Sequence, residues 1–297
     1  MIRPLVCFVF AGLLFTAPAP RAQIDWAPVA PIPAGELTDL LVSGDTLYVA
    51  TPAVIYRHPL GSSEWFESDS IIDVDFSSVA RFNGRLYAGT FQNGVYESTN
   101  GGTTWTPRSS GLSGPGSLAI TCLEVRGDSL YAGTSGAGVW LLPIGSTTWQ
   151  PFRDGLGSLV AWDVHSLRAI DGRLFCGAGQ SGFLFFVEPG QSQWTNIQFY
   201  PTAGNGTYML AFGGSLDTLY GAGSNGLYVS VDSGLNWSRT PSPFNPADEG
   251  AIVTVNSRIF GLLGFLTHGS YVYEFTNGAW TEYDHQPGVL AVDLVAD

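Results

Sequence analysis

A β-propeller of four-stranded blades is the fold that this sequence predicts. A short segment of the type Leu-Tyr-Ala-Gly-Thr recurs six times, a tryptophan closes each repeat, and no stretch has the apolar spacing of a helix. Four strands in roughly 40 to 45 residues are typical of one propeller blade. One blade cannot bury both faces of its own sheet, so we expect the aromatic and aliphatic residues to pack between neighbouring blades.

The recurring segment predicts one strand of each unit, and the runs around it predict the other three. Their β-branched and aromatic residues, bounded by Gly, Asn and Ser, are typical of strands. The six copies of the segment are Leu47–Thr51, Leu86–Thr90, Leu130–Thr134, Leu174–Ala178, Leu219–Gly223 and Ile259–Gly261. The tryptophans that close the units are Trp65, Trp105, Trp149, Trp194, Trp237 and Trp280. An apolar stretch such as Leu123–Val125 precedes each copy and a further strand follows it, which gives four strands per unit.

The two ends of the chain predict a seventh, incomplete blade. Trp26 resembles the last strand of a unit that lacks its first three, and Val289–Val295 resembles a first strand after which the sequence stops. We therefore expect six complete blades plus a partial seventh shared by the termini. The alternative is a six-bladed ring with these two strands added at its edge.

Residues 1–22 have the pattern of a secretory signal peptide, which leaves residues 23–297 as a single propeller domain. Arg3 precedes an apolar run from Leu5 to Phe15, and small residues up to Ala22 provide a cleavage site. The run is shorter than the roughly 20 residues that span a bilayer, and no later apolar stretch is longer. We therefore expect export to the periplasm or the extracellular space, without a membrane span.

The chain is strongly acidic, with 12 Lys plus Arg against 25 Asp plus Glu and a formal net charge of −13. Such a surface repels phosphate backbones and anionic lipids, so nucleic-acid and membrane-surface binding are not expected. The same charge favours solubility, and we expect a monomer.

Two cysteines, Cys122 and Cys176, remain beyond the signal segment. Position 176 corresponds to Ala88 and Ala132 in sibling units, which favours a small buried residue. A disulfide is the alternative, because an oxidising compartment would preserve it. The spacing of the two matches no metal motif.

Two hairpins carry a recognisable motif. Residues 98–105 read Ser-Thr-Asn-Gly-Gly-Thr-Thr-Trp, and residues 230–237 read Ser-Val-Asp-Ser-Gly-Leu-Asn-Trp. Both resemble the Asp-box, Ser-x-Asp-x-Gly-x-Thr-Trp, of bacterial-neuraminidase-type (BNR) propeller repeats, with Asn100 in place of the first aspartate. The resemblance implies a structural role, away from the ligand face, for Ser98, Asn100, Gly102, Trp105, Ser230, Asp232, Gly234 and Trp237.

The BNR resemblance covers the chain beyond the signal segment and is unspecific for function. Related repeats occur in sialidases, xyloglucanases, sortilin-type receptors and photosystem II assembly factors, and this sequence is most similar to secreted bacterial members of unassigned role. A sialidase needs an early Arg-Ile-Pro motif, whereas residues 30–33 read Ala-Pro-Ile-Pro. A cofactor-assembly chaperone is a further role that the resemblance implies.

No catalytic, metal-binding or cofactor-binding residue is predicted. The four histidines share no metal-ligand spacing, and two dinucleotide-like fingerprints, Gly177–Gly182 and Gly221–Gly226, precede strands where a dinucleotide site needs a helix. Glycoside hydrolysis needs two carboxylates about 5 to 10 Å apart. Acidic residues occur on the predicted innermost strands, and Asp163 and His165 should share one strand face; the channel candidates are Asp73, Asp163 and His165. We interpret them as solvated channel residues and keep a glycan-active hydrolase as the alternative function.

Propeller ligands usually bind on the face formed by the loops from second to third strand and from blade to blade. These loops carry aromatic residues interleaved with arginines, a combination found in binding hot spots. The ligand-face candidates are Arg108, Arg153, Tyr200, Arg239, Phe265, His268, Tyr283 and His285. The sequence therefore predicts a secreted, non-enzymatic interaction module for a protein or glycan partner, without a cofactor.

Overall fold

The computed structural model describes most of the chain between residues 38 and 286. The described ranges are 10–12, 26–28, 38–60, 62–157, 162–179, 183–197, 209–223, 226–240, 250–255, 258–265, 269–276 and 279–286. Every element named in these ranges is a β-strand. Within them, no helix has the length and apolarity needed to cross a membrane.

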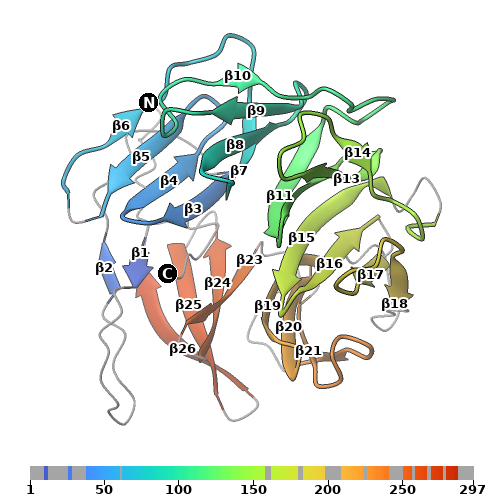
Figure 1. Cartoon of the computed structure of the whole chain (residues 1–297). Helices are drawn as coiled ribbons and strands as arrows, with labels where there is room; N and C mark the ends of the chain where they lie inside the picture. The colour runs from blue at the N-terminus through green and yellow to red at the C-terminus, as the bar shows by residue number, and fades with distance from the viewer. Residues whose placement is uncertain are drawn as a thin grey trace.

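Six four-stranded antiparallel sheets follow one another along the chain and stand around a common axis (Figure 1), which confirms the predicted propeller. Blade 1 consists of β3 (Asp39–Ser43), β4 (Thr46–Ala50), β5 (Ile55–Pro59) and β6 (Phe66–Glu67). Blade 2 consists of β7 (Phe76–Phe82), β8 (Arg85–Thr90), β9 (Val95–Ser98) and β10 (Thr106–Pro107). Blade 3 consists of β11 (Ile120–Arg126), β12 (Ser129–Thr134), β13 (Gly138–Pro143) and β14 (Gln150–Pro151).

The second half of the ring repeats this order. Blade 4 consists of β15 (Val164–Ile170), β16 (Arg173–Ala178), β17 (Phe183–Val187) and β18 (Thr195–Ile197). Blade 5 consists of β19 (Met209–Ser215), β20 (Thr218–Gly223), β21 (Gly226–Ser230) and β22 (Ser238–Arg239). Blade 6 consists of β23 (Gly250–Val255), β24 (Arg258–Phe265), β25 (Gly269–Thr276) and β26 (Ala279–Gln286). The first strand of each blade lies nearest the axis and contacts the first strand of the next blade, from β3 round to β23.

A seventh, two-stranded sheet contains the predicted strand at Trp26. It pairs β1 (Phe10–Gly12) with β2 (Trp26–Pro28), so the described partner of β2 comes from the segment expected to be the signal. Figure 1 draws this sheet in the sector between blades 1 and 6. Val289–Val295 lies outside the described residues, and the sharing of a seventh blade by the two termini stays a prediction.

The glycine of the recurring segment allows adjacent blades to approach closely. A Cβ atom on Gly133 would lie 2.6 Å from Sγ of Cys122 and 2.6 Å from Cγ1 of Val164, which belongs to the next blade. A Cβ on Gly89 would meet the innermost strand of the following blade in the same way. The glycine therefore marks a packing contact between blades, since no side chain fits between the strands.

The threonine that ends the segment closes the turn to the third strand. Thr90 Oγ1 donates a hydrogen bond to the carbonyl of Gly94 at 2.8 Å and accepts one from the Asn93 amide at 2.9 Å. The hydroxyls of Thr51 and Thr134 make the equivalent pairs of bonds. A threonine here satisfies the turn amides that the sheet leaves unpaired.

Three of the closing tryptophans fasten one blade to the blade before it. Each tryptophan donates a hydrogen bond from its indole N–H. Trp149 donates to the carbonyl of Arg108 at 2.8 Å, Trp194 to the carbonyl of Phe152 at 2.8 Å, and Trp280 to Oγ1 of Thr240 at 3.3 Å. We call this bond the tryptophan latch. All three rings are buried, so each latch combines a large apolar contact with a satisfied indole.

The two hairpins that resemble Asp-boxes place their tryptophans differently. Trp237 donates to the carbonyl of Gly234 within its own hairpin at 2.9 Å, and Nε1 of Trp105 has no hydrogen-bond partner among the described residues. In the 230–237 hairpin, Ser230 Oγ accepts from the Gly234 amide and donates to Asp232, which accepts from the Asn236 amide. Ser98, Asn100, Gly102 and Thr104 repeat this pattern. These motif residues therefore hold their own hairpins.

An arginine takes the place of the latch at these two joints. Arg57 of blade 1 donates to the carbonyl of Gly101 in the blade 2 hairpin at 3.3 Å. Arg173 of blade 4 donates to the carbonyl of Ser233 in the blade 5 hairpin. We call this bond the arginine clasp. The direction of donation is reversed relative to the latch, since the preceding blade now supplies the donor.

Cys122 and Cys176 are free thiols, as the small buried residue interpretation requires. Cys176 is fully buried against Phe185 and Trp194. Burial raises the pKa of Cys122 to about 12 and that of Cys176 well above its ordinary value. Such thiols stay protonated and are poor nucleophiles.

Two substitutions of Trp194 should separate the stability that comes from its apolar contact from the stability that comes from its indole hydrogen bond. We expect Trp194→Ala to lower the free energy of unfolding by about 3–5 kcal/mol, because a large side chain leaves a cavity. Trp194→Phe should lower it by about 1 kcal/mol, because mainly the hydrogen bond is lost. Urea unfolding followed by far-ultraviolet circular dichroism measures both changes.

The control for these variants is Val231→Ala, which trims a side chain that is 76% exposed and should change the free energy by less than about 0.5 kcal/mol. Hydrogen exchange should also become faster around residues 152–157 in Trp194→Phe. Unchanged stability and unchanged exchange in that variant would rule out the latch as a stabilising bond.

Candidate binding face

The loops at one end of blades 2 to 4 are joined by backbone hydrogen bonds. Each bond connects a turn between second and third strands with a loop between two blades. The five bonds run from the amide of Phe91 to the carbonyl of Asp75 (2.9 Å), Gly94 to Leu118 (2.8 Å), Ser135 to Ala119 (2.9 Å), Gly136 to Trp162 (3.0 Å) and Gly179 to Asp163 (2.7 Å). We call these connected loops the loop belt: residues 68–75, 90–94, 108–119, 134–138, 152–157, 162–163 and 179. The belt is thus a surface whose backbone is fixed before any partner binds.

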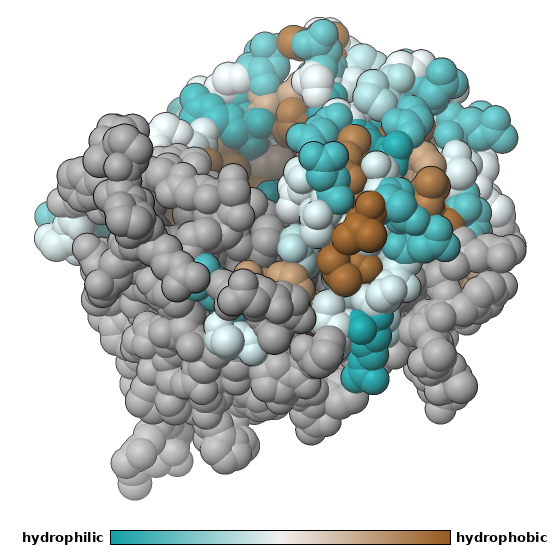
Figure 2. All heavy atoms as spheres, turned by 90° about the horizontal axis from the view of Figure 1, so that it is seen from below, coloured by the Kyte–Doolittle hydropathy of each residue, from teal (hydrophilic) through white to brown (hydrophobic). Residues whose placement is uncertain are grey.

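Three large apolar side chains of the belt are exposed. Ile72 is 88% exposed, Phe91 45% and Leu118 42%. Phe91 and Gly94 bracket one turn, which bonds to Asp75 on one side and to Leu118 on the other. Figure 2, seen from below relative to Figure 1, shows a described surface that is mainly hydrophilic with a few separate hydrophobic areas. Exposed apolar side chains gathered on fixed loops are typical of interaction sites.

Arg153, a predicted ligand-face residue, lies on two tryptophan rings of the belt region. Its guanidinium carbon is 4.4 Å from the ring centroid of Trp162 and 5.7 Å from that of Trp140. Among the described residues, its hydrogen bond goes to the carbonyl of Ala137 at 3.3 Å. The half-buried side chain is therefore held by cation–π contacts, with most of its N–H donors left for a ligand.

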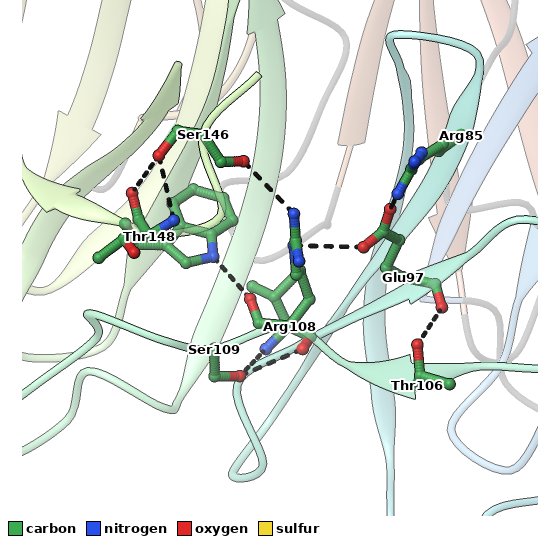
Figure 3. A network of polar contacts seen from close by, with 9 residues as sticks. Arg85, Glu97, Thr106, Arg108, Ser109, Ser146 and Thr148 are labelled. Carbon is green, nitrogen blue, oxygen red and sulfur yellow. Dashed lines mark hydrogen bonds and ion pairs between the residues drawn. The ribbon is translucent and has the colours of Figure 1, made fainter. Parts of the chain in front are cut away.

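Arg108, also predicted for the ligand face, braces blades 2 and 3 (Figure 3). Its Nε lies 3.2 Å from Oε2 of Glu97 in an ion pair, and its Nη2 donates to the carbonyl of Ser146 in blade 3 at 3.3 Å. Glu97 is nearly buried and also pairs with Arg85. The guanidinium of Arg108 is thus occupied by the fold, and its carbonyl accepts the latch of Trp149.

The described structure does not bring the remaining ligand-face candidates together at one site. Arg239 is exposed at the end of β22. Phe265, Tyr283 and His285 were expected in loops but lie in β24 and β26, because these two strands of blade 6 extend for eight residues each. Tyr200 and His268 lie outside the described residues.

Of the channel candidates, Asp73 is not on an innermost strand. It lies in an exposed turn before β7 with φ of 58°, a conformation that aspartate tolerates better than most side chains. Asp163 precedes β15 and forms an isolated bridge with Ser135, while His165 sits at a bulge between Val164 and Ser166. The two therefore do not share one face of a regular strand.

Ser135, Asp163 and His165 are the residue types of a hydrolytic triad, but their hydrogen bonds are arranged differently. The Ser135 hydroxyl donates to Oδ1 of Asp163 at 2.9 Å, whereas a serine nucleophile hands its proton to an imidazole. Burial lowers the pKa of His165, against the opposing effects of the Asp163 charge and a hydrogen bond with the Gly179 backbone. The described bonds join turns of the belt and do not assemble a nucleophile.

Two carboxylates of the innermost strands bond to the blade that follows. Asp39 Oδ2 accepts a hydrogen bond from the Val79 amide at 2.7 Å, and Glu124 Oε1 accepts one from the Ala169 amide at 3.0 Å. Burial raises the pKa of Glu124, while Arg168 and the Ala169 amide act in the opposite direction. Among the described residues, no group of three or more His, Cys, Asp or Glu side chains could hold a metal ion.

No family model matches this chain, and no curated protein sequence does. Solved structures are similar to it: the extracellular domain of the putative one component system BT4673 from B. thetaiotaomicron aligns with a TM-score of 0.66 and 14% identity over 94% of this chain and 35% of that one. YCF48 bound to D1 peptide aligns with 0.63 and 16% over 83% and 81%. The GH74 xyloglucanase from Xanthomonas campestris aligns with 0.58 and 15% over 81% and 46%.

The chain is a β-propeller. At identities of 14–16%, the similarity to these structures shows the fold alone. The function must therefore be inferred from the residues of the candidate face. Four residues on that face were not among those predicted from the sequence: Ile72, Phe91, Leu118 and Trp162. One signal was available for Phe91, which follows Thr90 where sibling units have Pro52 and Ser135.

Glu124 should make stability depend on pH. Because burial raises its pKa above the 4.5 of a free side chain, the folded protein binds this proton more tightly than the unfolded chain does. The stability that it contributes is therefore present below pH 4.5 and is lost as the pH rises through the folded-state pKa. Glu124→Gln keeps an acceptor for the Ala169 amide and removes the titration, so its stability should decline less over that interval.

Urea midpoints measured from pH 4 to 7.5 test this expectation. Glu64→Gln, which neutralises an exposed carboxylate, is the control and should keep the pH dependence of the original chain. The same dependence in Glu124→Gln would show that Glu124 does not carry it.

Proposed function

We propose that this protein is an exported, non-enzymatic interaction module that binds a partner protein, as a monomer, through the loop belt. The observation that carries the proposal is the exposure of Ile72, Phe91 and Leu118 on loops that backbone hydrogen bonds cross-link. Pre-fixed loops lose little conformational entropy on binding, so their exposed apolar area is available for affinity. A D1 peptide bound to YCF48, a similar fold, supports protein binding as a use of this architecture.

A protein is the favoured partner over a glycan because of the kind of side chain exposed. Ile72 and Leu118 are aliphatic, and aliphatic groups match the side chains of a partner protein better than the polar rim of a sugar. The alternative, a hydrolase similar to the xyloglucanase, needs two free carboxylates beside a substrate. On the innermost strands, Asp39 and Glu124 are not free in this sense, because each accepts a hydrogen bond from the backbone of the next blade.

A double variant, Phe91→Ser with Leu118→Ser, tests the proposal. Peptides selected from a displayed library against the purified protein should bind the variant at least about tenfold more weakly, because two apolar side chains are removed from the contact. Val231→Ser with Leu235→Ser is the matched control, since it removes two exposed apolar side chains from the hairpin of blade 5 and should leave binding unchanged. Fluorescence anisotropy gives the dissociation constants.

The competing functions are tested with the same purified proteins. Turnover of chromogenic glycosides or polysaccharides would replace the proposal with a hydrolase. Binding on a glycan array that is lost in the belt variant, without binding of any peptide, would assign a glycan partner instead. Equal weakening by the belt variant and the control would remove the belt from the function.

A further inference from the structure

One part of the loop belt combines exposed apolar side chains with exposed acidic ones. The loop from blade 1 to blade 2 carries exposed Asp69, Asp73 and Asp75 around the exposed Ile72. The next turn adds Phe91, whose amide bonds to the carbonyl of Asp75. We call Ile72, Phe91 and Leu118, with Asp69, Asp73 and Asp75, the acid-rimmed patch.

The backbone under the patch is held from several sides. The Asp69 amide donates to the carbonyl of Thr103 at 2.8 Å, and the Val74 amide to that of Ile71 at 3.4 Å. Val74 is buried beside them. On the far side, the space that a Cβ of Gly94 would need is taken by Ser109 and by Cδ2 of Leu118. The patch therefore has a defined shape before a partner arrives.

The three aspartates of the patch have no ion pair among the described residues. Of the two arginines in the belt, Arg108 pairs with Glu97. Arg153 lies on the rings of Trp140 and Trp162, at the joint of blades 3 and 4, whereas the three aspartates lie in the loop from blade 1 to blade 2. In a chain of net charge −13, this leaves a local negative potential around an apolar surface.

We infer that the acid-rimmed patch binds a cationic, apolar segment of the partner protein, in which Lys or Arg lies next to a bulky aliphatic or aromatic residue. The inference rests on the proposed function and specifies the chemistry of its partner. Apolar side chains of this segment pack on Ile72, Phe91 and Leu118, while its cations meet Asp69, Asp73 and Asp75. Exposed charge pairs add little affinity but select the partner and speed its approach, so the preference for cations weakens as salt is added.

Three synthetic peptides with the same leucine and phenylalanine residues, separated by Lys, by Gln or by Glu, are the probes. On the purified full chain at low ionic strength, we expect the Lys peptide to bind at least about tenfold more tightly than the Glu peptide, with the Gln peptide between them. The differences in affinity between the three peptides should become smaller in high salt, because the exposed charges are then screened.

The triple variant Asp69→Asn, Asp73→Asn and Asp75→Asn removes the charges while keeping side-chain size, and asparagine tolerates the positive φ of position 73. We expect it to bind the three peptides alike. The matched control is Asp45→Asn, Asp128→Asn and Asp217→Asn, three turn residues between first and second strands, at the opposite end of the strands. It changes the net charge equally and should keep the preference.

Each outcome separates the inference from the proposed function. Loss of the preference in the control as well would assign it to the overall charge and overturn the inference. Absence of any charge preference, with all peptides weakened by Phe91→Ser with Leu118→Ser, would overturn the inference and leave the proposed function standing. No weakening of any peptide by that double variant would overturn both.

Discussion

Packing between neighbouring blades determines where the large buried side chains of this propeller lie. A four-stranded sheet exposes two apolar faces, and in a ring each face must meet the next blade. The tryptophan latch makes this contact specific, because a buried indole both fills the joint and satisfies its own N–H. Gly89 and Gly133 serve the same contact from the inside, where the innermost strand of the next blade leaves no room for a side chain.

The repeat made the fold predictable, because each residue of the recurring segment has a local reason to be there. The recurring segment and the closing tryptophan each occur once in every one of the six units, so six blades could be read directly from the sequence. The ends of strands that depend on pairing with a neighbouring strand were predicted wrongly. Phe265 and His285 lie in strands because their partners, Gly269 and Tyr271, continue the ladders of blade 6, which no local pattern reveals.

The candidate face was predictable in place but only partly in its residues. Arg153 remains available on its tryptophans, whereas Arg108 pairs with Glu97, a residue of another strand that sequence spacing could not bring to it. Ile72 and Leu118 occur in loops that follow no repeat, so no sibling position marks them. The loops that break the pattern carry the binding chemistry, and the repeat supplies the frame that fixes them.

Latches and clasps hold different joints of the ring. Latches join blade 2 to blade 3 and blade 3 to blade 4, while the joints at both ends of this trio are arginine clasps at hairpin tips. The loop belt lies almost wholly on the trio. Because the same latch joins blade 2 to blade 3 and blade 3 to blade 4, the frame beneath the belt is continuous across these three blades.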